Sequence, residues 1–283
     1  MKLCVPLTEI HFHLQRPANY LQPLRLLQKL KRQRMVGTAK ISAVIDGGEC
    51  GIGTESTIID MSKTPYKILR EAALPKETIE KALADDLTVL GITGGTGCGK
   101  TTALRQLEAL GAMIIDCDAV YHELLETDAE LLNAIETAFP GSVVNGKLDR
   151  KRLGGIVFGS ERDLKLLNEI THHYISLEVE RRLCDFAMNG GELAAIDAIA
   201  LIESGLAKRC KAVIGVVAET EIRVQRIMKR DGISREYAVK RIAAQKPNEF
   251  FENSCDYVLH NDTTERDFAD KCTNLYKEVL KNG

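Results

Sequence analysis

The chain has 283 residues, a formal net charge of −2 and eight cysteines. Its apolar and charged fractions are those of an ordinary globular protein, and its near-neutral charge gives no basic field for nucleic-acid binding. No apolar run is long enough to span a bilayer, so we expect no membrane association. The cysteines form neither a C-x-x-C pair nor a Cys/His ligand set, which predicts free thiols, a cytoplasmic location and no structural zinc.

The first part of the chain changes character twice. Residues 1–36 hold seven Lys and Arg side chains against the single acid Glu9. We interpret them as a poorly ordered basic tail rather than a binding element, although 24–30 has the pattern of a short amphipathic helix. Residues 37–84 predict a small α+β segment, with strands at 41–46 and 56–60 and a helix at 75–82.

Residues 85–283 alternate between strand-like and helix-like segments. The predicted strands are 88–92, 112–116, 193–197, 212–218 and 257–261. Their nearly continuous apolar character is typical of parallel strands buried on both faces. A stripe on the last helix, made of Phe268, Cys272, Leu275, Tyr276 and Val279, predicts core packing, with a capping box at 264–267. The fold class is therefore α/β, a five-stranded parallel sheet flanked by helices.

A glycine-rich segment follows the first of these strands. Residues 94–101 read Gly-Gly-Thr-Gly-Cys-Gly-Lys-Thr and fit G-x-x-x-x-G-K-[ST], between an apolar run and a helix-like stretch. This context is typical of a phosphate loop, in which backbone N–H groups and a helix start bind an anion. A chance glycine-rich turn is the weaker alternative, because Lys and Thr stand at the required offset. The expected ATP-binding residues are Gly94, Gly95, Thr96, Gly97, Cys98, Gly99, Lys100, Thr101 and Thr102.

Two acids follow the second predicted strand. In a phosphate loop Lys100 reaches the β/γ-phosphates and the Thr101 hydroxyl ligates Mg²⁺. Asp116 and Asp118 stand at the carboxyl end of strand 112–116, where ligands bind in open α/β sheets. One carboxylate is expected to support Mg²⁺ or its waters, and the other to accept a hydroxyl proton. The alternative is that Asp118 only caps the helix that begins near Ala119.

Basic side chains crowd the stretch after the fourth predicted strand. They are Arg223, Arg226, Lys229, Arg230, Arg235, Lys240 and Arg241. About half are expected to form a solvated helix face. The others, on a lid hinged near Gly232, are candidates to neutralise a transferring phosphate. His172 and His173 are either a ligand-contacting pair or an ordinary surface pair, and without further ligands they predict no metal site.

These residues together resemble the dephospho-CoA kinase family from about 88 to 261. Besides the phosphate loop, the matching segments are Ile114-Ile115-Asp116-Cys117-Asp118, Leu148-Asp149-Arg150, Asn168 with His172, Leu201-Ile202-Glu203, Lys229-Arg230-Asp231, Arg241 with Gln245, and Asp256-Tyr257-Val258 with Asn261. The phosphate loop alone indicates only a superfamily. Its combination with the Asp-x-Asp and the Arg-Asp…Arg…Gln pattern is far more specific.

The resemblance implies transfer of the γ-phosphate of ATP to the 3′-hydroxyl of dephospho-CoA, with Mg²⁺ as cofactor and no protein partner. It implies that Lys100 and Asp118 are catalytic and that Asn261 lies near the adenine. Asp116 is then the carboxylate expected to support the metal ion. The acceptor-binding residues it implies are Asp118, Arg150, His172 and Glu203. The lid candidates it implies are Arg230, Arg235 and Arg241.

Two positions depart from the family pattern on the acceptor side. His173 and Ile199 stand where the family usually has proline. They leave ATP binding intact and keep a second acceptor open, namely another nucleoside or nucleotide. A non-catalytic nucleotide-binding protein is the other alternative, and the retained Lys100, Thr101 and Asp118 argue against it. A GTPase is not expected, because no Asn-Lys-x-Asp sequence is present.

The segment at about 40–83 resembles the closing part of a different family, threonylcarbamoyl-AMP synthase. Ile45-Asp46-Gly47-Gly48, residues 53–60 and Ile68-Leu69-Arg70 carry the resemblance. Ser56 and Arg70 match nucleotide-contacting positions, whereas Glu71-Ala72 replaces the usual Pro-Gly. About fifty residues bury too little surface to rebuild such a domain. We therefore expect a remnant at 37–84 without synthase activity.

Overall fold

A computed structural model describes residues 57–281, which divide into two compact units. Residues 57–83 with Met188–Gly190 form the smaller unit, and Ala84–Ala187 with 191–281 form the larger one. The predicted basic tail, its helical piece at 24–30 and the strand at 41–46 lie outside the described residues. The three-part division of the chain and the remnant at 37–84 stay predictions.

The smaller unit contains a two-stranded antiparallel sheet. β1 (Ile58–Asp60) pairs with β2 (Lys67–Arg70), and α2 (Lys76–Asp85) follows. The Thr57 hydroxyl donates to the Leu74 carbonyl at 2.9 Å and accepts from the Leu74 N–H at 3.0 Å, which closes the turn after β2. β1 and α2 form where the sequence predicts them. The pattern of β2 is too short to have been recognised as a strand.

The larger unit is built on a five-stranded parallel sheet, which confirms the predicted fold class. Its strands are β3 (Thr88–Thr93), β4 (Met113–Asp116), β7 (Leu193–Asp197), β8 (Ala212–Val217) and β9 (Tyr257–His260), in the order β4-β7-β3-β8-β9. Every boundary agrees with the sequence prediction to within one residue. All six residues of β8 are buried, as expected for a strand covered on both faces.

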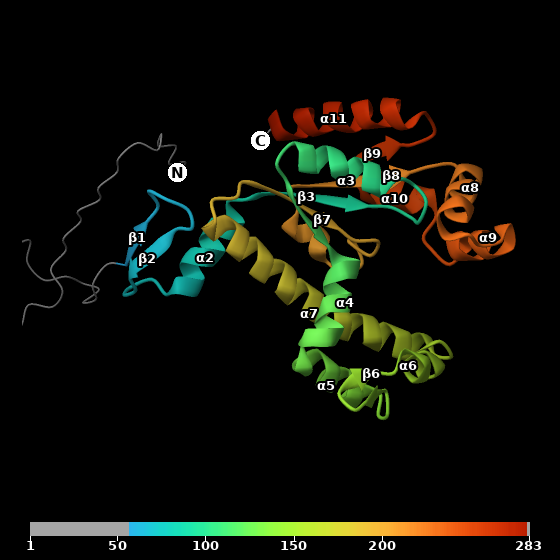
Figure 1. Ribbon diagram of the computed structural model, residues 1–283, viewed down its shortest axis with the longest axis horizontal. Helices are drawn as coiled ribbons and strands as arrows, with labels where there is room; N and C mark the ends of the chain where they lie inside the picture. Colours follow the sequence, from blue (N-terminus) through green and yellow to red (C-terminus); the bar gives the residue numbers. More distant parts are fainter. Residues whose placement is uncertain (1–56, 282–283) are drawn as a thin grey trace, which may run out of the picture. The chain divides into compact units, whose positions relative to one another are not determined.

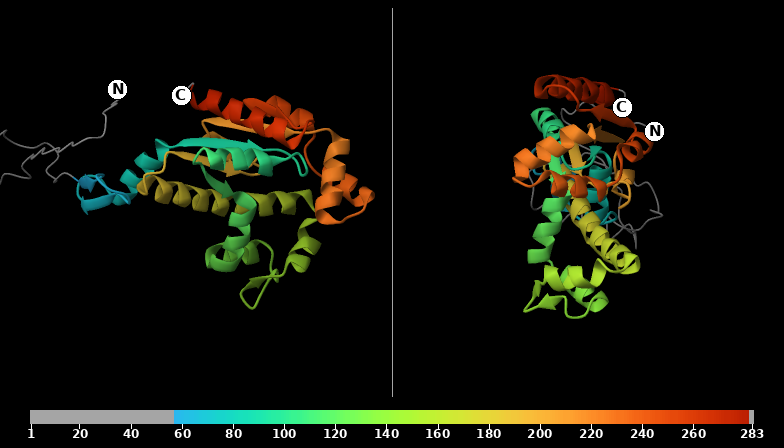
Figure 2. Two further views of the ribbon diagram at one scale, coloured as in Figure 1. Left: turned by 45° about the horizontal axis from the view of Figure 1, so that its top comes forward. Right: turned by 90° about the vertical axis from the view of Figure 1, so that its right-hand side faces the viewer.

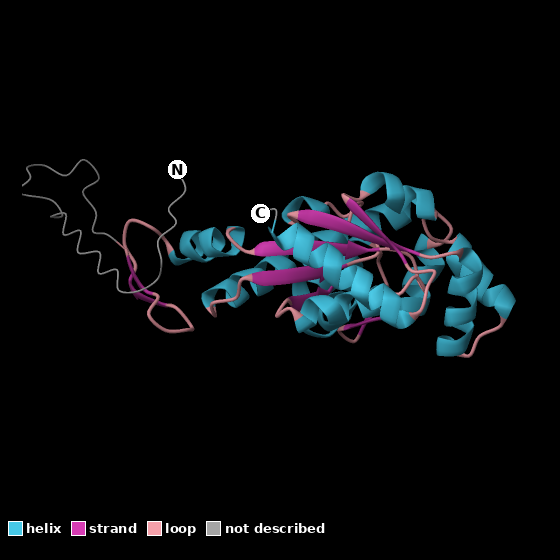
Figure 3. Cartoon of the chain, turned by 90° about the horizontal axis from the view of Figure 1, so that it is seen from above, coloured by secondary structure: helices cyan, strands magenta, loops and turns pink. Residues whose placement is uncertain are grey.

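Helices cover both faces of this sheet. α3 (Lys100–Ala109) and α11 (Glu265–Lys281) pack together on one face, and α7 (Glu161–Met188) runs along the other (Figures 1 and 2). α4 (Cys117–Thr127) continues directly from β4, and α10 (Asn248–Ser254) packs on β8 and β9. Figure 3 shows the helices crossing over the strands. None of the helices described in residues 57–281 is long and apolar enough to cross a membrane.

Two helical groups extend from this sheet. α5 (Ala129–Ala138), the short strands β5 (Val143–Val144) and β6 (Lys147–Leu148), and α6 (Arg150–Val157) form one group, reached through α4. α8 (Thr220–Asp231) and α9 (Arg235–Ala243) form the other, beyond the carboxyl end of β3 (Figure 1). Gly232 ends α8 with φ 65°, a left-handed conformation that glycine adopts readily. The turn between the two predicted lid helices is thus confirmed.

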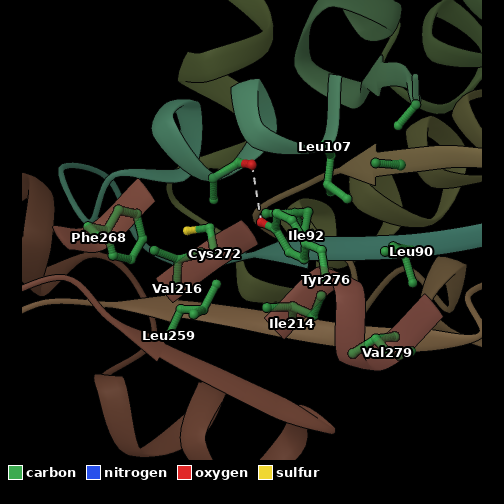
Figure 4. Close-up of a cluster of buried hydrophobic side chains, with 14 of the residues drawn as sticks. Leu90, Ile92, Leu107, Ile214, Val216, Leu259, Phe268, Cys272, Tyr276 and Val279 are labelled. Carbon is green, nitrogen blue, oxygen red and sulfur yellow. Dashed lines mark hydrogen bonds between the residues drawn. The ribbon is translucent and has the colours of Figure 1, made fainter. Parts of the chain in front are cut away.

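The largest described core cluster lies between the sheet, α3 and α11 (Figure 4). Four of the five residues in the predicted α11 stripe are buried, and Leu275 packs against them from the edge. The Tyr276 hydroxyl donates to the Ala103 carbonyl at 3.1 Å and so joins α11 to the helix that follows the phosphate loop. At the start of α11 the Thr264 hydroxyl accepts from the Asp267 N–H at 3.2 Å, as the predicted cap requires.

The Tyr276 contact gives a stability test. We expect Tyr276→Phe to lower the free energy of unfolding by about 1 kcal/mol, through the lost hydrogen bond, and Tyr276→Ala by about 3–5 kcal/mol, through the added cavity. Tyr237→Phe is the matched control, since Tyr237 is 56% exposed and its change should stay within about 0.5 kcal/mol. Urea titrations measure all three. Equal values for Tyr276→Phe and Tyr237→Phe would show that the buried hydroxyl contributes nothing.

Candidate functional site

The phosphate loop lies between β3 and α3 with its backbone pressed against neighbouring elements. Gly94, Gly97 and Gly99 have φ values of 142°, 78° and 102°, which side chains rarely tolerate. A Cβ at Gly94 would overlap the Val216 carbonyl, and one at Gly99 would overlap the Asn261 amide. Glycine is therefore required twice over, for conformation and for space.

Asn261 binds the C-terminal part of this loop, at Cys98. Its side-chain N–H donates to the Cys98 carbonyl at 2.8 Å, and Arg226 donates to its side-chain oxygen at 3.2 Å. The Cys98 thiol donates to the Gly95 carbonyl at 2.7 Å, and burial raises its pKa, so it stays neutral. A pocket of about 210 Å³ opens beside this contact, lined by Gly99, Thr102, Arg226, Asn261, Glu265 and Phe268.

Arg223 binds the N-terminal part of the loop, at Thr96. The charge pattern of α8 gave no reason to separate this arginine from the solvated ones, yet it is only 2% exposed. Its Nε donates to the Thr96 carbonyl at 2.9 Å, and a terminal nitrogen donates to Gln245 Oε1 at 3.2 Å. The same Gln245 oxygen accepts from the Thr96 N–H at 2.8 Å. The loop is thus bound on both sides by residues that follow β8.

Three aspartates, Asp116, Asp118 and Asp197, lie at the carboxyl edge of the sheet, and Asp197 is beside Lys100. Asp116 and Asp197 are register partners at the ends of β4 and β7. The Lys100 ammonium donates to the Gly94 carbonyl at 3.2 Å and lies 3.8 Å from Asp197 Oδ1, too far for a hydrogen bond. That buried oxygen has no hydrogen-bond partner among the described residues. Burial raises the pKa of Asp197 to about 6, partly opposed by Lys100 and reinforced by Asp116 and Asp118.

Asp197 was not among the site residues predicted from the sequence, although it ends the predicted strand 193–197. Its position at a strand's carboxyl end, where Asp116 was recognised, is the signal that would have found it.

The two acids after β4 differ in what they do locally. Asp116 is the N-cap of α4, and its Oδ1 accepts from the Asp118 N–H at 2.9 Å and the Ala119 N–H at 3.1 Å. The alternative in which Asp118 caps the helix is therefore wrong, because the helix begins earlier, at Cys117. The Asp118 side chain is exposed in the first turn and has no hydrogen-bond or ion-pair partner among residues 57–281.

The residues expected on the acceptor side fall into two groups. The guanidinium of Arg150, at the start of α6, lies 3.1 Å from His122 Nδ1 on α4. His172, half-buried on α7, has a pKa lowered by its burial, and Glu203 lies near enough to oppose that shift. His173 is exposed, so the two histidines differ in their surroundings, and their pairing at a ligand stays a prediction. His122 was missed, although it stands one helical turn after Asp118.

Two of the three lid candidates meet at one acid. Arg230 donates to Asp231 at 2.7 Å and to the Thr96 hydroxyl at 3.4 Å, and Arg241 donates to the other Asp231 oxygen at 2.5 Å. These bonds, chiefly the one from Arg230, lower the pKa of Asp231 to about 2. Arg235 instead pairs with Glu221 at 2.5 and 2.8 Å. The structure therefore brings Arg230 and Arg241 together, near the phosphate loop, and leaves Arg235 apart.

The donor set at the sheet edge suits Mg²⁺. Within residues 57–281 no group of three or more His, Cys, Asp or Glu side chains could hold a metal by itself. Mg²⁺ in phosphoryl-transfer sites usually keeps waters and takes only one or two carboxylates beside the phosphates. Thr101 and Asp116 offer oxygen ligands, and the unpartnered Asp197 oxygen offers an acceptor for a metal-bound water. These residues fit the ion.

The buried Asp197 gives a pH test. Because its pKa is raised on folding, its charge opposes folding above about pH 6 and has no such effect below about pH 4. Asp197→Asn should therefore raise the free energy of unfolding of the nucleotide-free protein by about 1–3 kcal/mol near pH 7.5. The gain should shrink as the pH falls toward 5.

Asp270→Asn, an exposed substitution on α11, is the control and should change nothing. Urea titrations at both pH values provide the measurement. If Asp197→Asn raised the free energy of unfolding equally at both pH values, the raised pKa of a buried Asp197 carboxylate would be contradicted.

Comparison with known proteins identifies the family. The family model for dephospho-CoA kinase matches residues 88–267. A dephospho-CoA kinase from Lactobacillus johnsonii is 33% identical over 67% of this chain and 97% of its own length. One from Geobacter sulfurreducens is 37% identical over 63% of this chain and 91% of its own length. The crystal structure of a Thermus thermophilus protein aligns with a TM-score of 0.57 and 31% identity, covering 68% of this chain and 97% of that one. The chain belongs to the dephospho-CoA kinase family.

Proposed function

We propose that this protein transfers the γ-phosphate of ATP to the 3′-hydroxyl of dephospho-CoA, giving coenzyme A and ADP, in the cytoplasm. One observation carries the proposal. In a chain of this family, an intact phosphate loop, Lys100 and the free Asp118 carboxylate stand at the same edge of the sheet. The free thiols of the described cysteines suit the reducing cytoplasm.

The ATP side of the proposed site is the loop and its anchors. Backbone N–H groups of 94–102 and the start of α3 would bind the phosphates, with Lys100 turning from the Gly94 carbonyl to the β/γ-phosphates. The pocket beside Asn261 would take the adenine. Arg230 and Arg241, held ready by Asp231, would neutralise the transferring group when α8 and α9 close. We assign Arg235 to a surface ion pair instead.

On the acceptor side, Asp118 would take the proton of the ribose 3′-hydroxyl while the oxygen of that hydroxyl attacks the γ-phosphorus. The bond to the β–γ bridging oxygen breaks, and ADP leaves. Arg150 with His122, and His172 with Glu203, would hold the acceptor. The departure at Ile199 is mild, because its carbonyl accepts from the Thr93 hydroxyl at 3.1 Å, a bond that proline would also permit.

Thr101, Asp116 and Asp197 would hold Mg²⁺ and its waters. The ion supplies charge neutralisation for the β- and γ-phosphate oxygens.

The proposed reaction predicts a specific acceptor. Purified protein should form ADP from Mg²⁺-ATP only when dephospho-CoA is added, and EDTA should stop the reaction until excess Mg²⁺ restores it. Because His173 and Ile199 depart from the family pattern, parallel assays test nucleosides and nucleotides in place of dephospho-CoA. If one of these compounds is phosphorylated faster than dephospho-CoA, the proposed acceptor is wrong. Threonine- and bicarbonate-dependent pyrophosphate release should be absent, since we propose no synthase activity for 37–84.

Two substitutions separate binding from proton transfer. Lys100→Ala should abolish turnover by removing charge from the phosphates. Asp118→Asn should lower kcat by roughly 10²-fold or more, the scale of a lost general base, and leave ATP affinity near normal. Glu126→Gln is the control, because Glu126 is an exposed acid on the same helix α4. Steady-state kinetics and ATP titrations give both quantities. An Asp118→Asn enzyme as fast as Glu126→Gln would remove Asp118 from the mechanism.

A further inference from the structure

We propose that Arg223 is a positioning residue whose buried positive charge, set behind the phosphate loop, strengthens binding of the polyphosphate tail of a nucleotide. The inference rests on the proposed nucleotide-binding function of that loop. It adds a residue from α8 whose guanidinium contacts the loop at Gly95 and Thr96, whereas Lys100 contacts the Gly94 carbonyl.

The Arg223 side chain is buried against the loop backbone and held there by several hydrogen bonds. Besides its bonds to Thr96 and Gln245, the guanidinium lies 3.4 Å from Asn248 Oδ1, and Asn248 in turn donates to the Ala218 carbonyl at 2.9 Å. A Cβ at Gly95 would overlap the guanidinium itself. The cation therefore occupies the space that a side chain of the loop would fill, directly behind the backbone that is expected to bind phosphate.

This charge has no counter-ion in the part of the chain that the structure describes. No carboxylate among residues 57–281 lies within 4 Å of Arg223, and all the hydrogen-bond acceptors it has there are neutral oxygens. Two other partly buried arginines of the larger unit do have acids, as Arg209 does with Glu180 and Arg182 with Glu178. Arg226, which is less buried than Arg223, also has only neutral acceptors among the described residues. Burial lowers the pKa of Arg223, which reflects the cost of keeping the cation out of water.

An unpaired buried cation needs a reason. An apolar side chain of similar size would fill this space without the desolvation cost. A bound polyphosphate supplies the missing negative charge, and in a dry site that attraction is screened little by salt. The bonds to Thr96 and Gln245 hold the guanidinium in place before the nucleotide arrives, so little ordering remains to be done on binding.

The test measures nucleotide binding without any acceptor. Calorimetric titrations of the full chain with ATP, AMP and inorganic triphosphate compare the wild type with Arg223→Gln and Arg223→Lys. Lys229→Gln, which removes an exposed charge from the same helix α8, is the matched control. Thermal melts report folding. If Arg223→Gln does not fold, Arg223→Met, apolar and of similar length, takes its place.

We expect the neutral variant to bind ATP and inorganic triphosphate about tenfold or more weakly, the scale of a lost buried charge, with a smaller loss for AMP. Arg223→Lys should recover at least half of the loss on a logarithmic scale. Equal losses for AMP and ATP, or no recovery by lysine, would show a purely structural role. Unchanged affinities in the neutral variant would also overturn the inference. Turnover of dephospho-CoA by the wild type is measured separately, so failure of the proposed reaction is distinguished from failure of this inference.

Discussion

The close packing of the phosphate-loop backbone against its neighbours is the constraint on which this structure depends. Side chains are absent at Gly94, Gly95 and Gly99 because a carbonyl, a guanidinium and an amide occupy their places. The loop is thereby joined to β8, α8 and the end of β9, which are distant from it in the sequence. The parallel sheet brings those elements to one edge, where they contact the loop.

The same edge collects charges that do not stabilise the fold. Asp197 keeps an oxygen without a hydrogen bond to any residue that the structure describes, and its pKa is raised to about 6 by burial. Arg223 has no acid partner within that same part of the chain. Each is costly in the free protein, and each faces a place where phosphate, metal or metal-bound water would supply the missing partner. Such local conflicts between stability and charge are expected where binding has been favoured over folding.

The sheet could be predicted from the sequence because its strands are short, continuous apolar runs, of which Leu193–Asp197 was predicted with both boundaries correct. The phosphate loop was predictable because its chemistry lies in consecutive residues. The burial of Arg223 could not be predicted, because the charge pattern of its helix does not show that the loop covers this one arginine. The cap role of Asp116 was not predicted, and only Asp118 was considered as an alternative cap, because a helix start is uncertain by a residue or two.

The acceptor residues show the same limit. Arg150 and His172 lie on different helices, and no hydrogen bond or ion pair joins them among the described residues. Their roles stay predictions, as does closure of α8 and α9. Arg235 shows why side-chain partners matter, because its pairing with Glu221 removes it from the pair of arginines that meet at Asp231.

A crystal structure with a non-hydrolysable ATP analogue, Mg²⁺ and dephospho-CoA tests the central claim most directly. The account predicts the γ-phosphate on the loop N–H groups, the Lys100 ammonium moved from the Gly94 carbonyl to a phosphate oxygen, and an Asp118 oxygen within about 3.2 Å of the ribose 3′-hydroxyl. A complex in which the loop holds the phosphates but Asp118 points away from every acceptor hydroxyl would contradict it.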